Sequence, residues 1–315
     1  MKHNIPVVLW LAAFFLIAQF IGIAVLYSYI DVDASMREGK TQFRGLELAG
    51  QPMERPQWEE STSFAWMMFA VLLGTAIMLV LMRFQFNVLW KFWYGLAVFT
   101  TLGLALAAFI PSTIAAIISL IVAIIKIFKP NWWVQNVSEL FMYSGLAVIF
   151  VPIMDLYGAI MLLILISIYD AYAVWKSKHM VTLAKFQAGS KMFAGLVMPY
   201  QDGHLKTDLP SDIEHKPETG SIKSKTSKKM AANPRLQTPS PVRTAILGGG
   251  DIGFPIIFNG VIMKSWGLYP SFVVPFTATI ALLYLFFKGE DGKFYPAMPF
   301  ISFGCLVGLA IAYFV

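Results

Sequence analysis

Long apolar stretches recur along nearly the whole chain, and they constrain its fold more than any other feature. An α-helix rises about 1.5 Å per residue, so about 20 apolar residues cross the roughly 30 Å of hydrocarbon in a bilayer. Hydrophobic residues make up 57% of the 315-residue chain. Charged residues make up 13%, about half the charged share of an ordinary soluble domain. We therefore expect an integral membrane protein.

The apolar stretches predict nine transmembrane helices, and so an all-α, polytopic membrane fold. Pro111 separates the third helix from the fourth, because the two stretches would otherwise form one apolar run. The first stretch is longer than the apolar part of a signal peptide, so we expect a retained helix. The nine expected ranges are 5–30, 63–82, 88–108, 110–128, 140–154, 156–175, 244–263, 270–287 and 296–315.

The distribution of Lys and Arg predicts the orientation of these helices, because cytoplasmic loops carry an excess of both residues. With the N-terminus inside, the inner segments hold 19 Lys and Arg residues and the outer segments hold five. Twelve of the 19 lie in one long loop, and without that loop the inner segments still lead by seven to five. We expect a cytoplasmic N-terminus, an external C-terminus and a multi-pass protein of the cell membrane.

A long polar loop divides the chain into three parts. Residues 202–241 of this loop are rich in Lys, Ser, Thr and Pro, which predicts a partly disordered linker. Residues 186–198 are more apolar and form a candidate amphipathic helix on the membrane surface. The three parts are 1–175 with six transmembrane helices and an outer loop at 31–62, the cytoplasmic loop 176–243, and 244–315 with three more helices.

Charge and residue types exclude other classes of function. The net charge of +6 does not indicate a nucleic-acid partner, because the basic residues flank apolar stretches, where topology and anionic lipid account for them. The single cysteine, Cys305, allows no intramolecular disulfide and no cysteine metal site. The four histidines lie in polar segments outside the apolar stretches. We expect no metal site and no cofactor.

Polar and aromatic residues near the ends of the expected helices need no special role. We interpret four charged residues there, Lys126, Glu139, Asp155 and Lys264, as reaching water or lipid headgroups. Tryptophans near helix ends are typical of the aromatic belt at a membrane interface. The tryptophans in question are Trp90, Trp93, Trp132 and Trp133.

Two carboxylates lie well inside apolar stretches, where an ionisable group costs about 3 kcal/mol and needs an explanation. Asp170 comes six residues before Lys176, and Asp251 comes eight residues after Arg243. In helices these separations are about 9 Å and about 12 Å from the inner end. Because the two helices are antiparallel, we expect both carboxylates at nearly the same depth.

Two aspartates at one depth are the groups that peptide hydrolysis by an activated water requires. Two carboxyl groups held close together cannot both ionise cheaply, so the pair retains one proton. The ionised member takes a proton from water while the protonated member polarises the scissile carbonyl. One water and two aspartates suffice for this reaction.

Short motifs surround both aspartates. Asp170 follows Tyr169, and Asp251 ends the run Leu247-Gly248-Gly249-Gly250-Asp251, which contains a G-x-G-D string at the start of an expected helix. Each glycine weakens a helix by roughly 1 kcal/mol relative to alanine. We therefore expect close backbone approach or local unwinding here, and space for an extended substrate strand.

These motifs resemble those of the presenilin and signal peptide peptidase family of G-x-G-D intramembrane aspartyl proteases, most closely its archaeal presenilin homologues. That family has nine transmembrane helices, a Tyr-Asp motif in the sixth, a G-x-G-D motif in the seventh and Pro-Ala-Leu at the start of the ninth. This chain has Pro296-Ala297-Met298 at the third place. Methionine and leucine are similar in volume and both apolar, so we expect the packing role to be kept.

The resemblance implies an aspartic-type endopeptidase that cuts transmembrane protein or peptide substrates without a cofactor. It implies that Asp170 and Asp251 are the catalytic pair. It further implies that substrates have their N-terminus outside. Residues implied to border the active site or receive substrate are Tyr169, Leu247, Gly248, Gly249, Gly250, Pro296, Ala297 and Met298.

Two other classes of function stay open at this point. Facing membrane carboxylates also serve as proton relays or cation sites, so a proton- or cation-coupled transporter or channel is the alternative. A noncatalytic scaffold is the third class, and it would tolerate loss of both carboxylates. The expected partners are transmembrane substrates and the lipid bilayer, and the sequence is compatible with a homo-oligomer.

Overall fold

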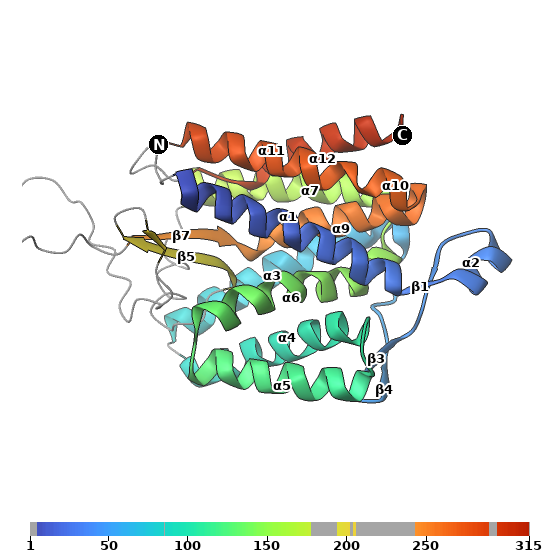
Figure 1. Ribbon diagram of the computed structural model, residues 1–315, viewed down its shortest axis with the longest axis horizontal. Coiled ribbons are helices and arrows are strands. Elements are labelled where there is room, and N and C mark those ends of the chain that lie inside the picture. The colour runs from blue at the N-terminus through green and yellow to red at the C-terminus, as the bar shows by residue number, and fades with distance from the viewer. Residues whose placement is uncertain are drawn as a thin grey trace, which may run out of the picture.

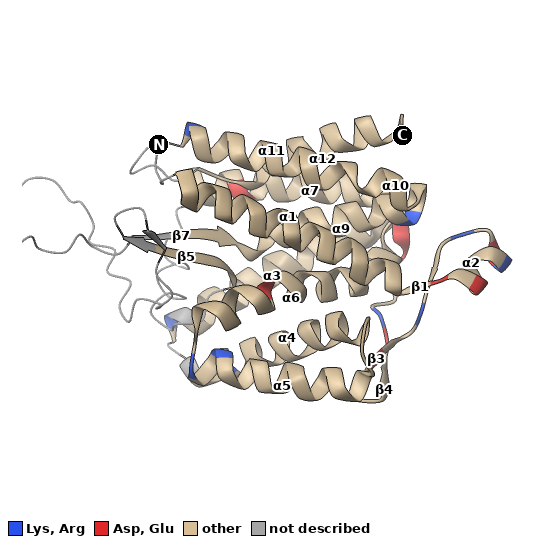
Figure 2. Ribbon diagram, in the orientation of Figure 1, with Lys and Arg blue, Asp and Glu red and all other residues tan. Residues whose placement is uncertain are grey.

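The computed structural model shows helices lying side by side in one bundle (Figure 1). It describes residues 5–84, 86–177, 194–201, 204–205, 243–289 and 295–314. At one end of the bundle, the strand end, β5 (Gly195–Gln201) lies beside β7 (Arg243–Gly248). At the opposite end, the hairpin end, residues 30–62 form short strands and turns. The ribbon segments coloured for charged residues lie mostly towards these two ends (Figure 2).

A helix lies at each of the nine positions that the apolar stretches predict. Six of the observed helices begin within two residues of the expected start and end within three of the expected end. The helices are α1 (Ile5–Ser28), α3 (Ser63–Arg83), α4 (Asn87–Ala107), α5 (Ser112–Phe128), α6 (Trp132–Phe150), α7 (Leu156–Tyr172), α9 (Gly249–Trp266), α11 (Val273–Lys288) and α12 (Met298–Ala312).

Length and composition qualify six helical segments of the described chain as membrane spans. They comprise α1, α3, α4, α6, α7 and the segment Leu268–Lys288, which joins α10 (Leu268–Ser271) to α11. Helices α5 and α12 are apolar but shorter. Helix α9 is continuous, but the polar residues Asp251, Asn259 and Lys264 interrupt its apolar sequence. The structure is therefore that of a mostly helical membrane protein, and nine crossings stay a prediction.

Helix α6 begins eight residues earlier than the expected start at residue 140. The Asn131 side chain accepts a hydrogen bond from the Trp133 backbone N–H and so caps the helix start. The polar residues that follow, Gln135, Asn136 and Glu139, are buried and hydrogen-bonded within the protein. Hydropathy excluded them from the expected helix because it does not register polar groups that find partners inside the bundle.

The expected helix at 244–263 is wrong at its start, because residues 244–248 belong to strand β7. This strand pairs antiparallel with β5, with Gly195 opposite Gly248 and Tyr200 opposite Arg243. A short strand, β6 (His204–Leu205), pairs with the far end of β5. The surface helix expected at 186–198 is also wrong for residues 195–198, which form part of strand β5. Residues 186–193 lie outside the described residues. The linker expected at 202–241 also lies outside them, apart from β6.

Helices α1, α6 and α9 pack against one another and contribute many of the fully buried side chains. Phe15 of α1 and Phe258 of α9 are among the largest of these. Because lipid is as apolar as such side chains, close packing rather than exclusion of water holds membrane helices together. At Gly145 of α6, an added Cβ would overlap the backbone carbonyl oxygen of Thr101 in α4, so the α4–α6 approach needs glycine.

The hairpin end is built from local turns. Asp31 caps α2 by accepting a hydrogen bond from the Ala34 backbone N–H at 3.0 Å. Ala49 and Gly50 have φ values of 56° and 75° and form the two-residue turn between two short strands. The elements here are β1 (Ile30–Asp31), α2 (Val32–Glu38), β2 (Gln42–Phe43), β3 (Leu46–Leu48), β4 (Gln51–Met53) and η1 (Glu60–Thr62), and η2 (Val151–Ile153) follows α6.

Candidate active site

Asp170 lies in the last turn of α7, and its side chain is held by the start of α12. The residue is 6% exposed. Its Oδ2 accepts a hydrogen bond from the Met298 backbone N–H at 3.1 Å, and the Ala297 backbone N–H also donates to this carboxylate. Beyond Asp170 the chain continues as a π-helical turn, η3 (Ala173–Ser177), a conformation frequent at functional sites. Backbone groups of Ala297 and Met298, more than 120 residues later in the sequence, thus fix the Asp170 carboxylate.

Asp251 lies in the first turn of α9, directly after the three glycines. Gly248 is the N-cap residue of α9, and its backbone N–H donates to the Asp251 carboxylate. A Cβ at position 248 would lie only 3.2 Å from Asp251 Oδ2, so glycine leaves room for the carboxylate to fold back over the helix start. Asp251 is half-buried and Gly250 is exposed, so one side of this turn lies at the protein surface.

The structure brings Asp170 and Asp251 close enough for their charges to interact. Helices α7 and α9, which carry them, pack against each other. The depth argument from helical rise is wrong in one respect, because residues 244–248 form a strand that rises about 3.3 Å per residue. The two carboxylates come together through the packing of α7 on α9, and not through equal helical distances from the bundle end.

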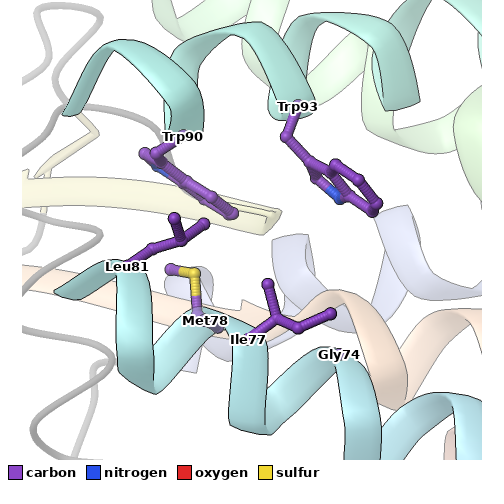
Figure 3. A pocket seen from close by; sticks show the side chains of 6 residues that line it. All are labelled: Gly74, Ile77, Met78, Leu81, Trp90 and Trp93. Carbon is purple, nitrogen blue, oxygen red and sulfur yellow. The ribbon is translucent and has the colours of Figure 1, made fainter. Parts of the chain in front are cut away.

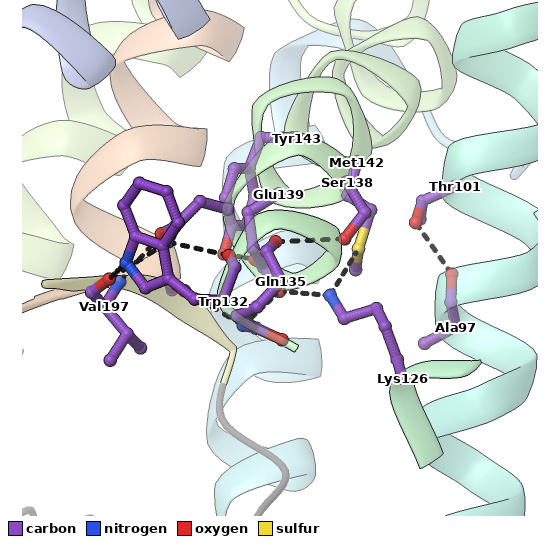
Figure 4. Close-up of polar contacts among 12 residues, drawn as sticks. Ala97, Thr101, Lys126, Trp132, Gln135, Ser138, Glu139, Met142, Tyr143 and Val197 are labelled. Atoms are coloured by element: carbon purple, nitrogen blue, oxygen red, sulfur yellow. Dashed lines mark hydrogen bonds and ion pairs between the residues drawn. The ribbon is translucent and has the colours of Figure 1, made fainter. Parts of the chain in front are cut away.

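Strand β7 leads directly into the Asp251 turn and is supported by β5. Leu247 of β7 lies opposite Leu196 of β5, and both side chains are buried. On its other edge, β5 is bound by α6: Asn136 Nδ2 donates to the Val197 carbonyl at 3.0 Å, and the Val197 N–H donates to Asn136 Oδ1 at 2.9 Å. The Trp132 indole N–H donates to the same carbonyl at 2.8 Å (Figure 4). Helix α6 and the short strand β6 therefore occupy this edge of β5, and β7 forms the opposite edge of the described sheet.

The remaining predicted site residues take different positions. Tyr169 is half-buried, and its hydroxyl lies 3.3 Å from Thr75 Oγ1, so it faces α3. Gly249 packs on the ring of Tyr143 in α6, and its backbone N–H donates to the Ala194 carbonyl at 3.1 Å. Pro296 is buried next to the two amides that bind Asp170. Among the described residues, no cluster of three or more His, Cys, Asp or Glu could hold a metal ion.

A family model described as signal-peptide peptidase, presenilin aspartyl protease matches residues 47–315. The chain belongs to this family. It is therefore an aspartyl protease of the intramembrane type, and the transport alternative receives no support. A search of curated proteins finds no significant match.

Solved structures show the same fold as this signal-peptide peptidase and presenilin family member. Two structures of a presenilin family intramembrane aspartate protease, in space groups C222 and P2, superpose with a TM-score of 0.55 each. The first shares 18% identity and covers 96% of this chain and 95% of its own; the second shares 19% and covers 97% and 96%. The fold is thus presenilin-like over nearly the whole chain.

Two polar residues of this protease that we interpreted as reaching water are buried. Lys126 is 2% exposed and Glu139 is 0% exposed, and Lys126 Nζ lies 2.6 Å from Glu139 Oε1. Asp155 instead caps α7, and Lys264 binds Glu60 at the hairpin end. The spacing of Gln135, Glu139 and Tyr143, four residues apart, would have indicated a polar stripe on one helix face. The belt interpretation is likewise wrong for Trp132, which is 6% exposed and binds β5.

A small hollow lies between α3 and α4 of this protease (Figure 3), and neither aspartate lines it. Its volume is about 40 Å³, too small for a peptide. The six residues around it include no titratable group: Gly74, Ile77, Met78, Leu81, Trp90 and Trp93. We therefore place the chemistry at the aspartates and not in this hollow.

Proposed function

We propose that this protease hydrolyses peptide bonds within transmembrane segments of membrane proteins, with Asp170 and Asp251 as its catalytic dyad. One observation carries the proposal: two helices from separate parts of the chain bring two carboxylates within interacting range inside a helical membrane bundle. In the same proposal the chain crosses the cell membrane nine times, with its N-terminus in the cytoplasm.

The proposed reaction uses one water held between the carboxyl groups. The ionised aspartate takes a proton from this water as the water oxygen attacks the scissile carbonyl carbon. The protonated aspartate gives its proton to the carbonyl oxygen, which yields a tetrahedral diol. Collapse of the diol transfers a proton to the amide nitrogen, breaks the C–N bond and returns one proton to the pair.

The substrate must be extended at the scissile bond, because a helix shields its peptide groups. Backbone groups freed by unwinding need hydrogen-bond partners inside the bilayer. Strand β7 offers them. The Val197 backbone groups face Asn136, so in an antiparallel pair the opposite residue, Ile246, directs its N–H and C=O away from β5. We propose that a substrate strand pairs with this edge, which no other described strand occupies, and so passes beside Asp251.

The decisive experiment is cleavage of a generic transmembrane peptide by the purified protein in detergent or vesicles. Asp170→Asn and Asp251→Asn keep side-chain volume and remove the ionisable group. We expect each to abolish cleavage, and a transition-state-mimicking aspartyl protease inhibitor to abolish cleavage by the unmodified protein. Cleavage at the normal rate by either variant, with the protein folded, would exclude the dyad.

A further inference from the structure

Glu139 is a fully buried carboxylate whose two oxygens are bound by three side chains (Figure 4). Oε1 accepts hydrogen bonds from Lys126 Nζ at 2.6 Å and from Gln135 Nε2 at 3.0 Å. Oε2 accepts a short hydrogen bond from the Tyr143 hydroxyl. A charge so far from water is costly unless its partners are fixed, so this arrangement is retained in one geometry.

Tyr143 connects Glu139 to the helix that carries Asp251. A Cβ at Gly249 would overlap the Tyr143 hydroxyl, and one at Gly253 would lie 3.4 Å from the Tyr143 ring. These two glycines precede and follow Asp251 by two residues. The tyrosine also lies close enough to interact with the Asp251 charge. The ring is therefore a support against which the first turn of α9 rests.

Gln135 connects the same carboxylate to the strand side of the turn. Its Nε2 donates to the Gly195 carbonyl of β5 at 3.1 Å as well as to Glu139. Gly195 lies opposite Gly248, whose N–H binds the Asp251 carboxylate. The Glu139 carboxylate is thus linked to both elements that meet at Asp251. It is linked to β7 through Gln135 and β5, and to α9 through Tyr143.

Lys126 of α5 holds the Glu139 carboxylate in place through the ion pair between them. Its Nζ lies 3.5 Å from Met142 Sδ and 5.5 Å from the centre of the Tyr94 ring, in addition to the ion pair. These contacts surround the ammonium group with an anion, a sulfur and an aromatic face. The lysine is consequently committed to this cluster and does not reach the membrane surface.

We propose that Glu139 is a positioning residue of the protease, and that it fixes Asp251 from two sides through Tyr143 and Gln135. Neither Glu139 nor Tyr143 is assigned a direct role in the reaction. The inference rests on the proposed function of Asp251. It implies that loosening this cluster changes the chemical step more than it changes substrate binding.

The test compares Tyr143→Phe with Tyr29→Phe in the purified full chain. Both changes remove one buried tyrosine hydroxyl, and Tyr29 donates to the Leu104 carbonyl at 2.9 Å at the hairpin end, far along the bundle from Asp251. For Tyr143→Phe we expect kcat to fall about tenfold with KM nearly unchanged, since small misplacements of a reacting group cost this much or more. The affinity for a hydroxyl-containing transition-state mimic should fall in parallel. Tyr29→Phe should lower thermal stability comparably and leave kcat within about twofold.

Glu139→Gln gives an independent check if Tyr143→Phe does not fold. It keeps the shape of the side chain and weakens the bonds to both Tyr143 and Gln135, so kcat should again fall with KM nearly constant. Unchanged kcat in whichever variant folds, or equal losses of kcat in Tyr143→Phe and Tyr29→Phe, would overturn the positioning role. If Asp251→Asn abolishes cleavage while Tyr143→Phe and Glu139→Gln remain fully active, the positioning role of Glu139 fails and the proposed dyad stands. If folded Asp251→Asn still cleaves the peptide, the proposed dyad itself fails.

Discussion

Among the residues that the structure describes, each end of the bundle holds one ion pair, and the two pairs have opposite surroundings. At the strand end, the Lys126 and Glu139 side chains are 1% and 0% exposed and their charged atoms lie 2.6 Å apart. At the hairpin end, Lys264 and Glu60 are 16% and 59% exposed and lie 3.2 Å apart. The sequence places Lys126 and Lys264 in equivalent positions, each two residues before the last residue of a helix. Tertiary packing separates them into a buried and an exposed pair.

The partners of each pair show what the difference means for function. Glu139 also binds Gln135 and Tyr143, which contact the elements on either side of Asp251. Lys264 instead binds the Pro152 and Met154 carbonyls, so it satisfies backbone groups where α6 ends. Buried ion pairs contribute little net stability but cost much when one partner is lost. In our proposal the strand-end pair organises the active site, whereas the hairpin-end pair binds backbone carbonyls that follow the end of α6.

The largest expected effect is that of Lys126→Met, which leaves Glu139 buried without its cation. We expect the free energy of unfolding to fall by about 3–5 kcal/mol. Reversible unfolding in mixed detergent micelles measures this loss. The double variant Lys126→Met/Glu139→Gln removes both charges and should recover much of the loss. If Lys126→Met lowers the free energy of unfolding by less than about 1 kcal/mol, the buried and exposed ion pairs do not differ in the way that we propose.

The next effect concerns the hydrogen bonds between α6 and β5. Asn136→Ala leaves the Val197 N–H without its partner and removes one of two bonds to the Val197 carbonyl, so unfolding should become easier by about 1–3 kcal/mol. We also expect slower peptide cleavage, because β5 supports β7. Asn131→Ala is the matched control: it removes the cap of the same helix, costs about 1 kcal/mol and leaves β5 untouched. Equal cleavage rates in the two variants would argue against a role for β5.

A smaller effect is expected from the free edge of β7. Ile246→Pro removes one backbone N–H from that edge, and proline is tolerated in edge strands. If substrate pairs there, KM should rise about tenfold, which corresponds to roughly 1.4 kcal/mol. Binding of a small active-site inhibitor that does not reach β7 should change little. Ile246→Val keeps the N–H and serves as the control; a KM increase in both variants would point to side-chain packing instead of strand pairing.

The smallest effect is expected at the hairpin end. Glu60→Gln removes the exposed ion pair with Lys264, and such pairs contribute about 0.2–1 kcal/mol. The Lys264 ammonium keeps its two carbonyl partners, so unfolding and cleavage should both stay close to those of the unmodified protein. Thermal unfolding and the peptide-cleavage assay, run beside Lys126→Met, measure the contrast. If Glu60→Gln lowers the stability as much as Lys126→Met does, the exposure of the two ion pairs does not explain their energetic difference.

Sequence patterns predicted most of the helices and the residues that we assign to chemistry. Apolar length placed the helices because a membrane span depends on local composition, and only a few ends, such as the start of α6, shifted by more than a few residues. The aspartates stood out because a carboxylate in an apolar stretch is rare and expensive. Pro296-Ala297-Met298 was found through a family motif alone, and the structure places its amides on Asp170.

What the sequence by itself determined is the membrane character of the chain, the order of its helices and the two aspartates with their motifs, since each is a property of a short segment. Tertiary structure alone decided that residues 243–248 are a strand, because that conformation depends on pairing with β5, more than 40 residues earlier. It also decided that Glu139 is buried and bound to Tyr143, which packs against the start of α9. A polar residue near a helix end is stable either in water or among polar side chains. For Glu139, the packing of α5, α6 and α9 determines that polar side chains surround it.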